Sequence, residues 1–517
     1  MKRKVLCLLL GLCLLGQLAL TQTTKHDFKV KGFHLDLRVQ VMKMPALKKF
    51  VQQLKSGGLN TLIMEWEATY PFKNHPLIPN QYAYSRQEVI DFINYCENLG
   101  IDVIPLQQSF GHVEYILRNY RYKELREDQK DYSQINPLQE EQAKTLFRDL
   151  YSDLISTHQS DYIHIGGDET YLLGHSKESQ QKVAQVGKGR LYGDYIKLLC
   201  ELVVELGKKP ILWADIALKY PDALTGLPKE TVFVDWNYGW DINMFGKHSN
   251  LLNSGFEIWG APSLRSHPDN YYITQWEKHF RNIREFIPQA REFGYQGMVI
   301  TSWSTSGLYS SFWESPKDLL ELYPVRRVYP LSGFNLLVSA FLKAVHSDQP
   351  LNADTFVSSY AQNRYGFSPQ QAQKFWNALR ANPYEINQGV VSSPELSIDQ
   401  VRDSAYWVLD QMQSLKPKKN ADEYAHYPLM AEIRAQYLSY MAIEHELNQP
   451  DFDSGKIPML TTELKKIMDN NLNNRFLELN KDFIYPREIA DEDFLRDEKV
   501  RLLYQRLTRS GRQDSSQ

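Results

Sequence analysis

Two adjacent carboxylates, Asp168 and Glu169, are the residues of this chain best placed to do chemistry. They follow a short apolar run and a glycine pair in Tyr162-Ile-His-Ile-Gly-Gly-Asp-Glu169. An apolar run that ends in glycine is typical of a buried strand, and α/β proteins place functional groups where such strands end. Neighbouring side chains of a regular strand point to opposite faces, so both acids can serve one site only if the backbone turns. Gly166 and Gly167 permit that turn.

Carboxylates this close are unsuited to flank a sugar as acid and nucleophile, because that arrangement needs the groups about 5 Å or more apart. They suit two different catalytic roles. One acid protonates the leaving oxygen, and the other orients a nucleophile that belongs to the substrate, such as a 2-acetamido carbonyl. Close like charges also raise the proton affinity of one member, as a general acid near neutral pH requires. The alternative is a turn whose acids cap the next helix or face water.

Four stretches of the sequence together resemble a known enzyme family. They are Gly32-Phe-His-Leu-Asp-Leu-Arg38, Ile104-Pro-Leu-Gln-Gln-Ser-Phe-Gly-His112, His164-Ile-Gly-Gly-Asp-Glu169 and Ile300-Thr-Ser-Trp303. In this order they resemble the β-N-acetylhexosaminidases of glycoside hydrolase family 20, over roughly two thirds of the chain. The resemblance implies a (β/α)8 TIM barrel and retaining, substrate-assisted cleavage through an oxazolinium intermediate. It also implies that Asp168 orients the acetamido group and that Glu169 is the acid/base.

Three further candidates follow the first and third predicted strands. Asp36 and Arg38 come after the first strand, where a guanidinium fork beside an acid is suited to grip sugar hydroxyls. The resemblance implies this role for Arg38, and a structural ion pair is the alternative. His112 matches the histidine of the family's Gly-His pair, which implies a group that faces the ligand or supports one that does. A loop histidine with satisfied hydrogen bonds is its alternative.

Tryptophans recur near the ends of the later strands, at Trp213, Trp236, Trp240, Trp259 and Trp303. A ring of indoles would stack on a pyranose, enclose the acetamido methyl and exclude water from a charged intermediate. Core packing is the alternative for each; we expect it for Trp240 and leave it open for Trp259. The other three match pocket positions of the family. Tyr238 resembles the tyrosine whose hydroxyl holds the acetamido oxygen.

Departures from the family pattern leave the sugar open. The second strand ends in Glu65-Trp-Glu67 where other members carry His-Trp-His, and one of these acids is expected to bind a hydroxyl or orient a neighbour. Many members have an acid where this chain has Thr305, and one branch has an acid where it has Asn237. Recognition of O4 is therefore unresolved. N-acetylgalactosamine and N-acetylglucosamine both remain candidate sugars, with a tilt toward the former.

Strand and helix patterns alternate from Lys31 onward, which is typical of parallel βα units. The predicted strands cover 31–37, 61–64, 102–106, a run from Tyr162, 210–213, 231–235, 256–259 and 297–301. The predicted helices cover 45–55, 85–99, 137–158, 189–206, 276–293 and 333–346. These elements predict a catalytic barrel over residues 25–347. Its functional side chains should collect at the carboxyl ends of the strands.

The two ends of the chain differ from the barrel. Residues 1–24 have a basic start, an apolar core and a small-residue segment, which predicts a signal peptide, with an uncleaved anchor as the alternative. We expect an exported protein, periplasmic or secreted, without stable membrane insertion. Helical periodicity at 355–365, 397–413, 427–446 and 460–479 predicts a helical C-terminal domain over 348–509. Residues 510–517 are predicted to be a disordered tail.

Net charge and cysteine content limit the classes of partner and cofactor to be expected. The 517 residues carry a net charge of -3, which gives no strong field for nucleic acid or an anionic membrane. Cys96 and Cys200 lie in helical patterns, so we expect buried thiols rather than a disulfide, and no metal-ligand spacing is present. We therefore expect a glycan or glycoconjugate partner and no cofactor or metal. The oligomeric state stays open, with a homodimer as one option.

The function favoured is removal of terminal β-linked N-acetylhexosamine by an exo-glycosidase. Two alternatives remain. A non-catalytic glycan-binding protein on the same barrel would not need the proton-donating acid. A two-carboxylate glycosidase would ignore the acetamido group of its substrate.

Overall fold

A computed structural model describes residues 27–513, except 267, 268, 270–273, 305–327, 382, 383, 385, 388 and 389. The signal peptide expected at 1–24, the position of Thr305 and the end of the expected tail, 514–517, lie outside the described residues. Within the described part, no helix is long and apolar enough to cross a membrane.

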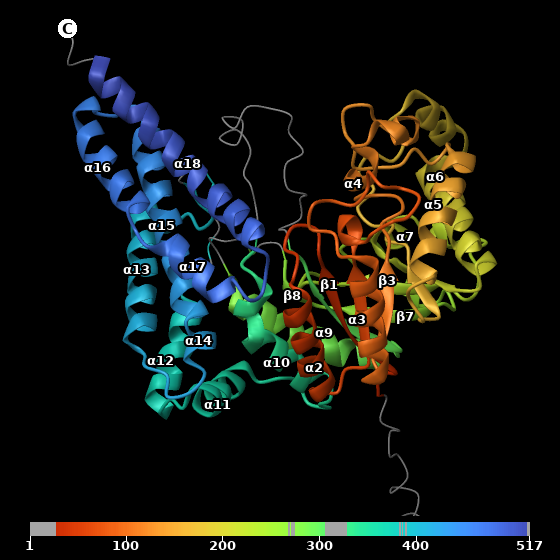
Figure 1. The fold of residues 1–517 in the computed structure, drawn as a ribbon, viewed down its shortest axis with the longest axis horizontal. Helices are drawn as coiled ribbons and strands as arrows, with labels where there is room; N and C mark the ends of the chain where they lie inside the picture. The colour runs from red at the N-terminus through yellow and green to blue at the C-terminus, as the bar shows by residue number, and fades with distance from the viewer. Residues whose placement is uncertain are drawn as a thin grey trace, which may run out of the picture.

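Parallel strands close into a barrel, which confirms the predicted α/β class and the (β/α)8 TIM architecture (Figure 1). Its strands are β1 (Val30–Asp36), β2 (Thr61–Glu65), β3 (Asp102–Leu106), β4 (Tyr162–His164), β5 (Lys209–Trp213), β6 (Val232–Trp236), β7 (Glu257–Ala261), β8 (Ser263–Arg265) and β9 (Gly297–Ser302). Their order is β1-β2-β3-β4-β5-β6-β7-β9-β8, and pairing of β1 with β9 closes the barrel. Both β7 and β8 pair with β9, so β8 continues the line of β7 beyond Pro262. The eighth barrel position is therefore β9.

Helices surround the strands. They are α2 (Met44–Ser56), α3 (Arg86–Asn98), α4 (Glu114–Leu117), α5 (Glu140–Ile155), α6 (Lys177–Glu205), α7 (Asp215–Lys219), α8 (His248–Leu252), α9 (Trp276–Glu292) and α10 (Asn335–Ala344). Short 3-10 turns lie at Glu67–Thr69, Tyr120–Leu125, Pro221–Leu224 and Leu331–Phe334. α6 begins earlier than predicted because Ser176 caps an extra segment, which joins the rest at a kink at Gly187, where φ is 83°.

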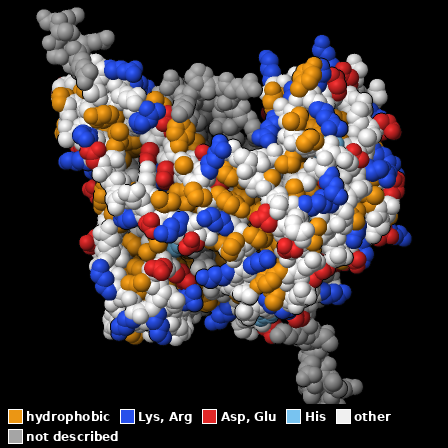
Figure 2. All heavy atoms as spheres, in the orientation of Figure 1, with side chains coloured by type: hydrophobic (Ala, Val, Ile, Leu, Met, Phe, Trp, Pro, Cys, Tyr) orange, Lys and Arg blue, Asp and Glu red, His pale blue; other side chains and the backbone are white. Residues whose placement is uncertain are grey.

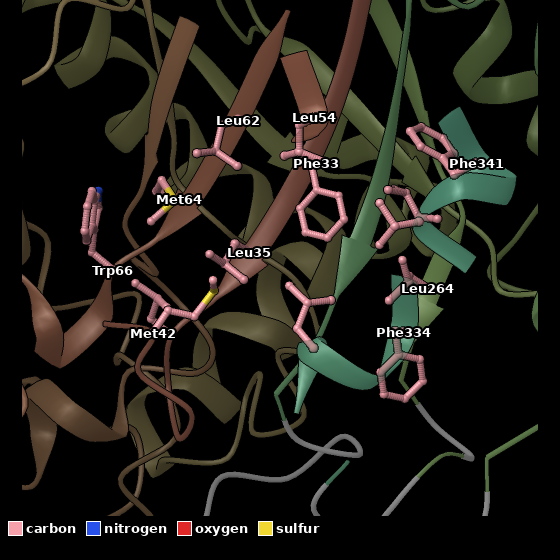
Figure 3. Close-up of a cluster of buried hydrophobic side chains, with 14 of the residues drawn as sticks. Phe33, Leu35, Met42, Leu54, Leu62, Met64, Trp66, Leu264, Phe334 and Phe341 are labelled. Carbon is pink, nitrogen blue, oxygen red and sulfur yellow. The ribbon is translucent and has the colours of Figure 1, made fainter. Parts of the chain in front are cut away.

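Side-chain alternation along β1 separates the core from the site. Phe33 and Leu35 point outward, where they join Leu54 of α2 and Phe341 of α10 in a buried cluster (Figure 3). A second cluster fills the barrel interior and includes Trp213 and Trp303. His34 lies against both of these indoles, with ring centroids 5.6 and 4.6 Å away. The inward residues of β1 therefore lead to Asp36 at the mouth.

A helical C-terminal region follows the barrel, as predicted. It contains α11 (Ala353–Tyr365), α12 (Pro369–Arg380), α13 (Ile398–Ser414), α14 (Ala421–Tyr424), α15 (His426–Leu447), α16 (Ile457–Met468), α17 (Leu472–Asn480) and α18 (Pro486–Gln513), with a small hairpin of β10 (Ile386–Asn387) and β11 (Val390–Val391) and a 3-10 turn at Ser454–Lys456. The single helix predicted over 460–479 is two helices, because the polar Asp469-Asn-Asn471 segment ends α16. Two of these helices, α12 and α18, were not predicted. The region lies on one side of the barrel (Figure 1).

The helical region holds the loop after β1. The backbone N–H of Lys43 donates to Phe483 O at 2.8 Å, and Met42 pairs with Ile484. Gln40 donates its amide to the Glu492 carboxylate of α18 at 3.2 Å. Since Arg38 lies two residues before Gln40, these contacts set the position of the barrel mouth.

Candidate active site

A tight turn after β4 places both acids on one side of the chain. Gly166 and Gly167 have φ values of 74° and 92°, and Glu169 itself has a φ of 47°, which is rare for a residue with a side chain. A Cβ on Gly166 would also collide with the side-chain oxygen of Gln108. The Tyr192 hydroxyl donates to Gly167 O at 2.8 Å and holds the turn. The glycine pair is thus required by both conformation and space.

His112 lies between the two carboxylates. Its Nε2 is 3.5 Å from Asp168 Oδ2 and 3.3 Å from Glu169 Oε2. Burial opposes protonation of His112, but the Asp168 charge and the hydrogen bonds to both acids hold its pKa well above the usual value. The histidine therefore carries a positive charge that both acids share.

The acidity of Glu169 differs from the expectation that a close like charge would raise its pKa. Burial raises the pKa of Glu169, but the hydrogen bond and charge of His112 outweigh it, helped by the Tyr171 hydroxyl, and the net pKa lies below the usual value. The imidazolium thus sets the net direction of the Glu169 pKa shift. In the free protein, the proton that an acid catalyst needs rests on His112, within reach of Glu169.

Asp168 offers an unused acceptor. It is 5% exposed, and its Oδ1 has no hydrogen-bond partner among the residues that the structure describes. A buried acceptor without a partner is unfavourable, by about 1–3 kcal/mol, unless a ligand satisfies it. The oxygen is therefore poised to accept a hydrogen bond from an N–H or O–H group of a bound molecule.

Asp215 is a third carboxylate at this centre, and the sequence analysis missed it. Its Oδ2 accepts from the backbone N–H of Glu169 at 3.1 Å, and its Oδ1 accepts from the Trp236 indole at 3.3 Å. Burial and the charge of Asp168 raise its pKa to about 7. The rule that functional groups follow barrel strands could have found it, since it stands directly after β5 in Trp213-Ala-Asp215.

Aromatic side chains line the interior beside the acids. The Trp303 indole donates to the Tyr238 hydroxyl at 2.7 Å, and its ring lies 5.8 Å from that of Trp213. Trp236 lies 5.2 Å from Tyr238. Burial raises the pKa of Tyr238, and the charges of Asp168 and Glu169 add to the effect. The structure thus brings the predicted aromatic residues into one group.

The two remaining tryptophans play different parts. Trp240 packs against Trp236, with centroids 5.3 Å apart. Trp259 is fully buried, and its indole donates to Glu257, at the first residue of β7. Trp259 therefore belongs to the barrel core, away from the strand ends near which the five tryptophans were expected.

Arg38 lies beside Trp303 and is held by Asp36. Its Nε donates to Asp36 Oδ2 at 3.1 Å, and its guanidinium stands 5.2 Å from the Trp303 ring centroid. Ser304 donates its backbone N–H and its hydroxyl to the same Asp36 oxygen, each at 2.9 Å. Burial alone would lower the pKa of Arg38, but the charges of Asp36 and nearby glutamates outweigh burial and raise it above the usual value. The guanidinium therefore stays charged.

The two glutamates near β2 differ in protonation. Glu65 is fully buried, and its oxygens are occupied by His34 at 2.9 Å and Gln108 at 3.0 Å. Burial opposes its ionisation, but the Arg38 charge and the His34 hydrogen bond hold its pKa well below the usual value. Burial and the Glu65 charge raise the pKa of Glu67 well above the usual range. Glu65 is thus an ionised structural group and Glu67 a neutral acid.

Known proteins are similar to this chain over its barrel. Residues 28–307 match the family model for the catalytic domain of glycosyl hydrolase family 20. Hexosaminidase D of Bos taurus is 26% identical over 359 residues, which cover 66% of this chain and 98% of that protein. Hexosaminidase D of Homo sapiens is 26% identical over 300 residues, or 55% of this chain and 62% of that protein. The family resemblance drawn from the motifs is confirmed.

A solved structure agrees at the level of the fold. The β-N-acetylhexosaminidase from Bacteroides fragilis NCTC 9343 superposes with a TM-score of 0.50 and 18% identity, over 65% of this chain and 69% of that one. No group of three or more His, Cys, Asp or Glu side chains in the described part of this chain is arranged to hold a metal ion.

Proposed function

The chain belongs to glycosyl hydrolase family 20, and from that premise we propose that it is an exo-acting β-N-acetylhexosaminidase. It removes a terminal β-linked N-acetylhexosamine, N-acetylgalactosamine or N-acetylglucosamine, with retention of configuration. The observation that carries the proposal is the unpartnered Asp168 Oδ1, buried beside Glu169. A substrate amide N–H is a donor that would satisfy it.

In the proposed first step, Glu169 takes the proton held on His112 and gives it to the glycosidic oxygen as the C1–O bond breaks. Asp168 accepts the amide N–H, and the acetamido oxygen attacks C1 to form an oxazolinium ion. The Tyr238 hydroxyl steadies that oxygen. In the second step, Glu169 removes a proton from water, which attacks C1, reopens the ring and restores the acetamido group.

The remaining residues bind the sugar. Arg38, held by Asp36, donates to hydroxyl groups of the sugar. Trp213, Trp236 and Trp303 present rings to the pyranose and the acetamido methyl. Lys and Arg side chains are interspersed with Asp and Glu on the face shown in Figure 2, which is compatible with a neutral glycan.

Hydrolysis of chromogenic β-N-acetylhexosaminides tests the proposal. We expect turnover that Glu169→Gln lowers by about 10²–10⁴-fold without loss of the folded state, as expected for removal of a general acid/base. Binding without turnover in the unmodified protein would instead identify a glycan-binding protein. Parallel rates on the two sugars establish the preference. If a substrate without the acetamido group reacted equally fast, a two-carboxylate glycosidase would replace our mechanism.

We also propose that the protein is exported, to the periplasm or the medium. Support comes from the basic start Met1-Lys-Arg-Lys4 and the apolar run from Val5 to Leu20. N-terminal sequencing of the protein from cell fractions tests this. A mature protein that begins near residue 24 supports export, and an intact Met1 in the cytosolic fraction contradicts it.

A further inference from the structure

One buried arginine lacks a counter-charge. Arg434 lies on α15 and is 9% exposed, and its one hydrogen bond runs from Nη1 to the backbone oxygen of Ala381 at 3.2 Å. Its Nε and Nη2 are buried and have no hydrogen-bond partner. Burial lowers its pKa to about 10, and no neighbouring charge contributes. The group therefore remains protonated near neutral pH, as a cation that nothing in the described structure neutralises.

The other buried arginines of the described residues differ. Arg38 bonds Asp36, and Arg496 bonds Asp493. Arg265 donates to Gln40, Tyr329 and Ser302, and although burial lowers its pKa to about 10, the charges of three carboxylates oppose that effect. Buried charges are generally paired because the isolated ion is strongly disfavoured. Arg434 departs from that pattern.

A cavity adjoins this cation. It has a volume of about 40 Å³ and is lined by Thr274, Trp276, Ala378, Leu379, Val408, Met412, Tyr427, Met430, Ala431 and Arg434. Most of these walls are apolar and offer no acceptor. The Tyr427 hydroxyl is engaged by Tyr365 at 3.2 Å. Since no described carboxylate faces Arg434, a molecule inside the cavity can supply the missing acceptor and charge.

We propose that Arg434 and this cavity bind one small monovalent inorganic anion, such as chloride. A water molecule, which occupies about 30 Å³ in the liquid, would fit and accept hydrogen bonds but would leave the charge uncompensated. An anion supplies both the acceptor and the charge. The volume excludes a sugar. Because the walls come from α9 of the barrel and from α12, α13 and α15, the bound anion links the barrel to the helical region.

Thermal unfolding of the full chain tests the proposal, with sodium bromide compared with sodium gluconate at equal ionic strength. Gluconate is too large for the cavity. We expect a saturable rise in Tm with bromide, absent in Arg434→Met. Arg380→Met is the matched control, because it removes a partly exposed arginine on α12 that pairs with Asp354, and it should keep the rise. An equal rise in Arg434→Met, or none in the unmodified protein, would overturn the proposal.

Crystallography keeps the proposal testable if Arg434→Met does not fold. Crystals of the unmodified protein grown in bromide should show an anomalous peak within hydrogen-bond distance of Arg434 Nε or Nη2. Density without an anomalous signal would identify water and contradict the anion site.

Discussion

The backbone N–H of Glu169 donates a hydrogen bond to the side chain of Asp215, at 3.1 Å. The bond ties the end of β4 to the residue after β5, and it holds Glu169 at its unusual positive φ of 47°. Backbone strain of this kind persists only where surrounding contacts enforce it. Asp215 is therefore a positioning residue for the acid beside it.

Replacement of Asp215 should lower turnover more than binding. We expect Asp215→Ala to reduce kcat by about tenfold or more, since a lost hydrogen bond to a positioned group is worth about 1–3 kcal/mol. KM should change little. Asp215→Asn keeps one acceptor oxygen and should restore part of kcat. Steady-state kinetics decides, and equal loss in both variants would show that the charge matters rather than the hydrogen bond.

Asp215 should also shape the pH dependence of stability. Its pKa is raised from 3.8 to about 7 in the folded protein, so between these values the folded state holds a proton that the unfolded state has lost. Stability should therefore fall as pH rises through this window. Tm measured against pH should show a shallower fall for Asp215→Asn than for the unmodified protein. Parallel curves would contradict the assignment.

Removal of His112 should move the alkaline limb of the activity profile. In the unmodified protein, the proton sits on a histidine whose pKa is raised well above 6.5 despite burial. In His112→Gln, the proton must sit on Glu169, where burial raises the pKa but no imidazolium stores the proton. We expect kcat/KM to decline at lower pH in this variant. An unchanged alkaline limb would separate His112 from the proton path.

Tyr171 combines a hydroxyl that bonds Glu169 with a ring that is 78% exposed. Tyr171→Phe removes a contact that lowers the Glu169 pKa, so the acidic limb should shift to higher pH. Tyr171→Ala also removes the ring, and we expect a further rise in KM for oligosaccharides but not for small aryl glycosides, because aromatic faces stack on sugars. Tyr120→Ala, at another tyrosine that is 75% exposed, is the control.

Glu65 and Glu67 should respond differently to the same change. Glu65→Gln replaces an ionised acceptor of His34 and should lower Tm clearly, since breaking a buried charged hydrogen bond is unfavourable by about 3–5 kcal/mol. Glu67→Gln replaces a neutral acid with a neutral amide, so Tm should change little. A rise in KM for Glu67→Gln alone would identify it as the acid that touches the sugar. Equal losses of Tm would contradict the protonation states.

The barrel and its acid pair could be predicted because local signals were strong. The glycines before Asp168 are readable in sequence, since their positive φ values favour glycine, and apolar residues recur in each strand. The location of the catalytic proton, on His112 rather than on Glu169, could not be predicted in the same way. It depends on the distances from His112 to Asp168 and Glu169, residues more than fifty positions apart in the chain.

The helical region shows the same limit. The Ser368 capping box that begins α12 was present in the sequence and was overlooked, whereas the break between α16 and α17 rests on a short polar segment within an apolar period. The lone charge of Arg434 could not be foreseen, because a residue's lack of partners depends on the whole fold.

The pairing of Met42 with Ile484 joins the loop after β1 to the helical region, so a chain truncated to the barrel would lose it. A gene cut after residue 347 would encode every barrel strand and every residue assigned to the sugar, yet it would lack the clamp on the segment that presents Arg38. Such a fragment would keep Asp168 and Glu169 but would bind the substrate weakly.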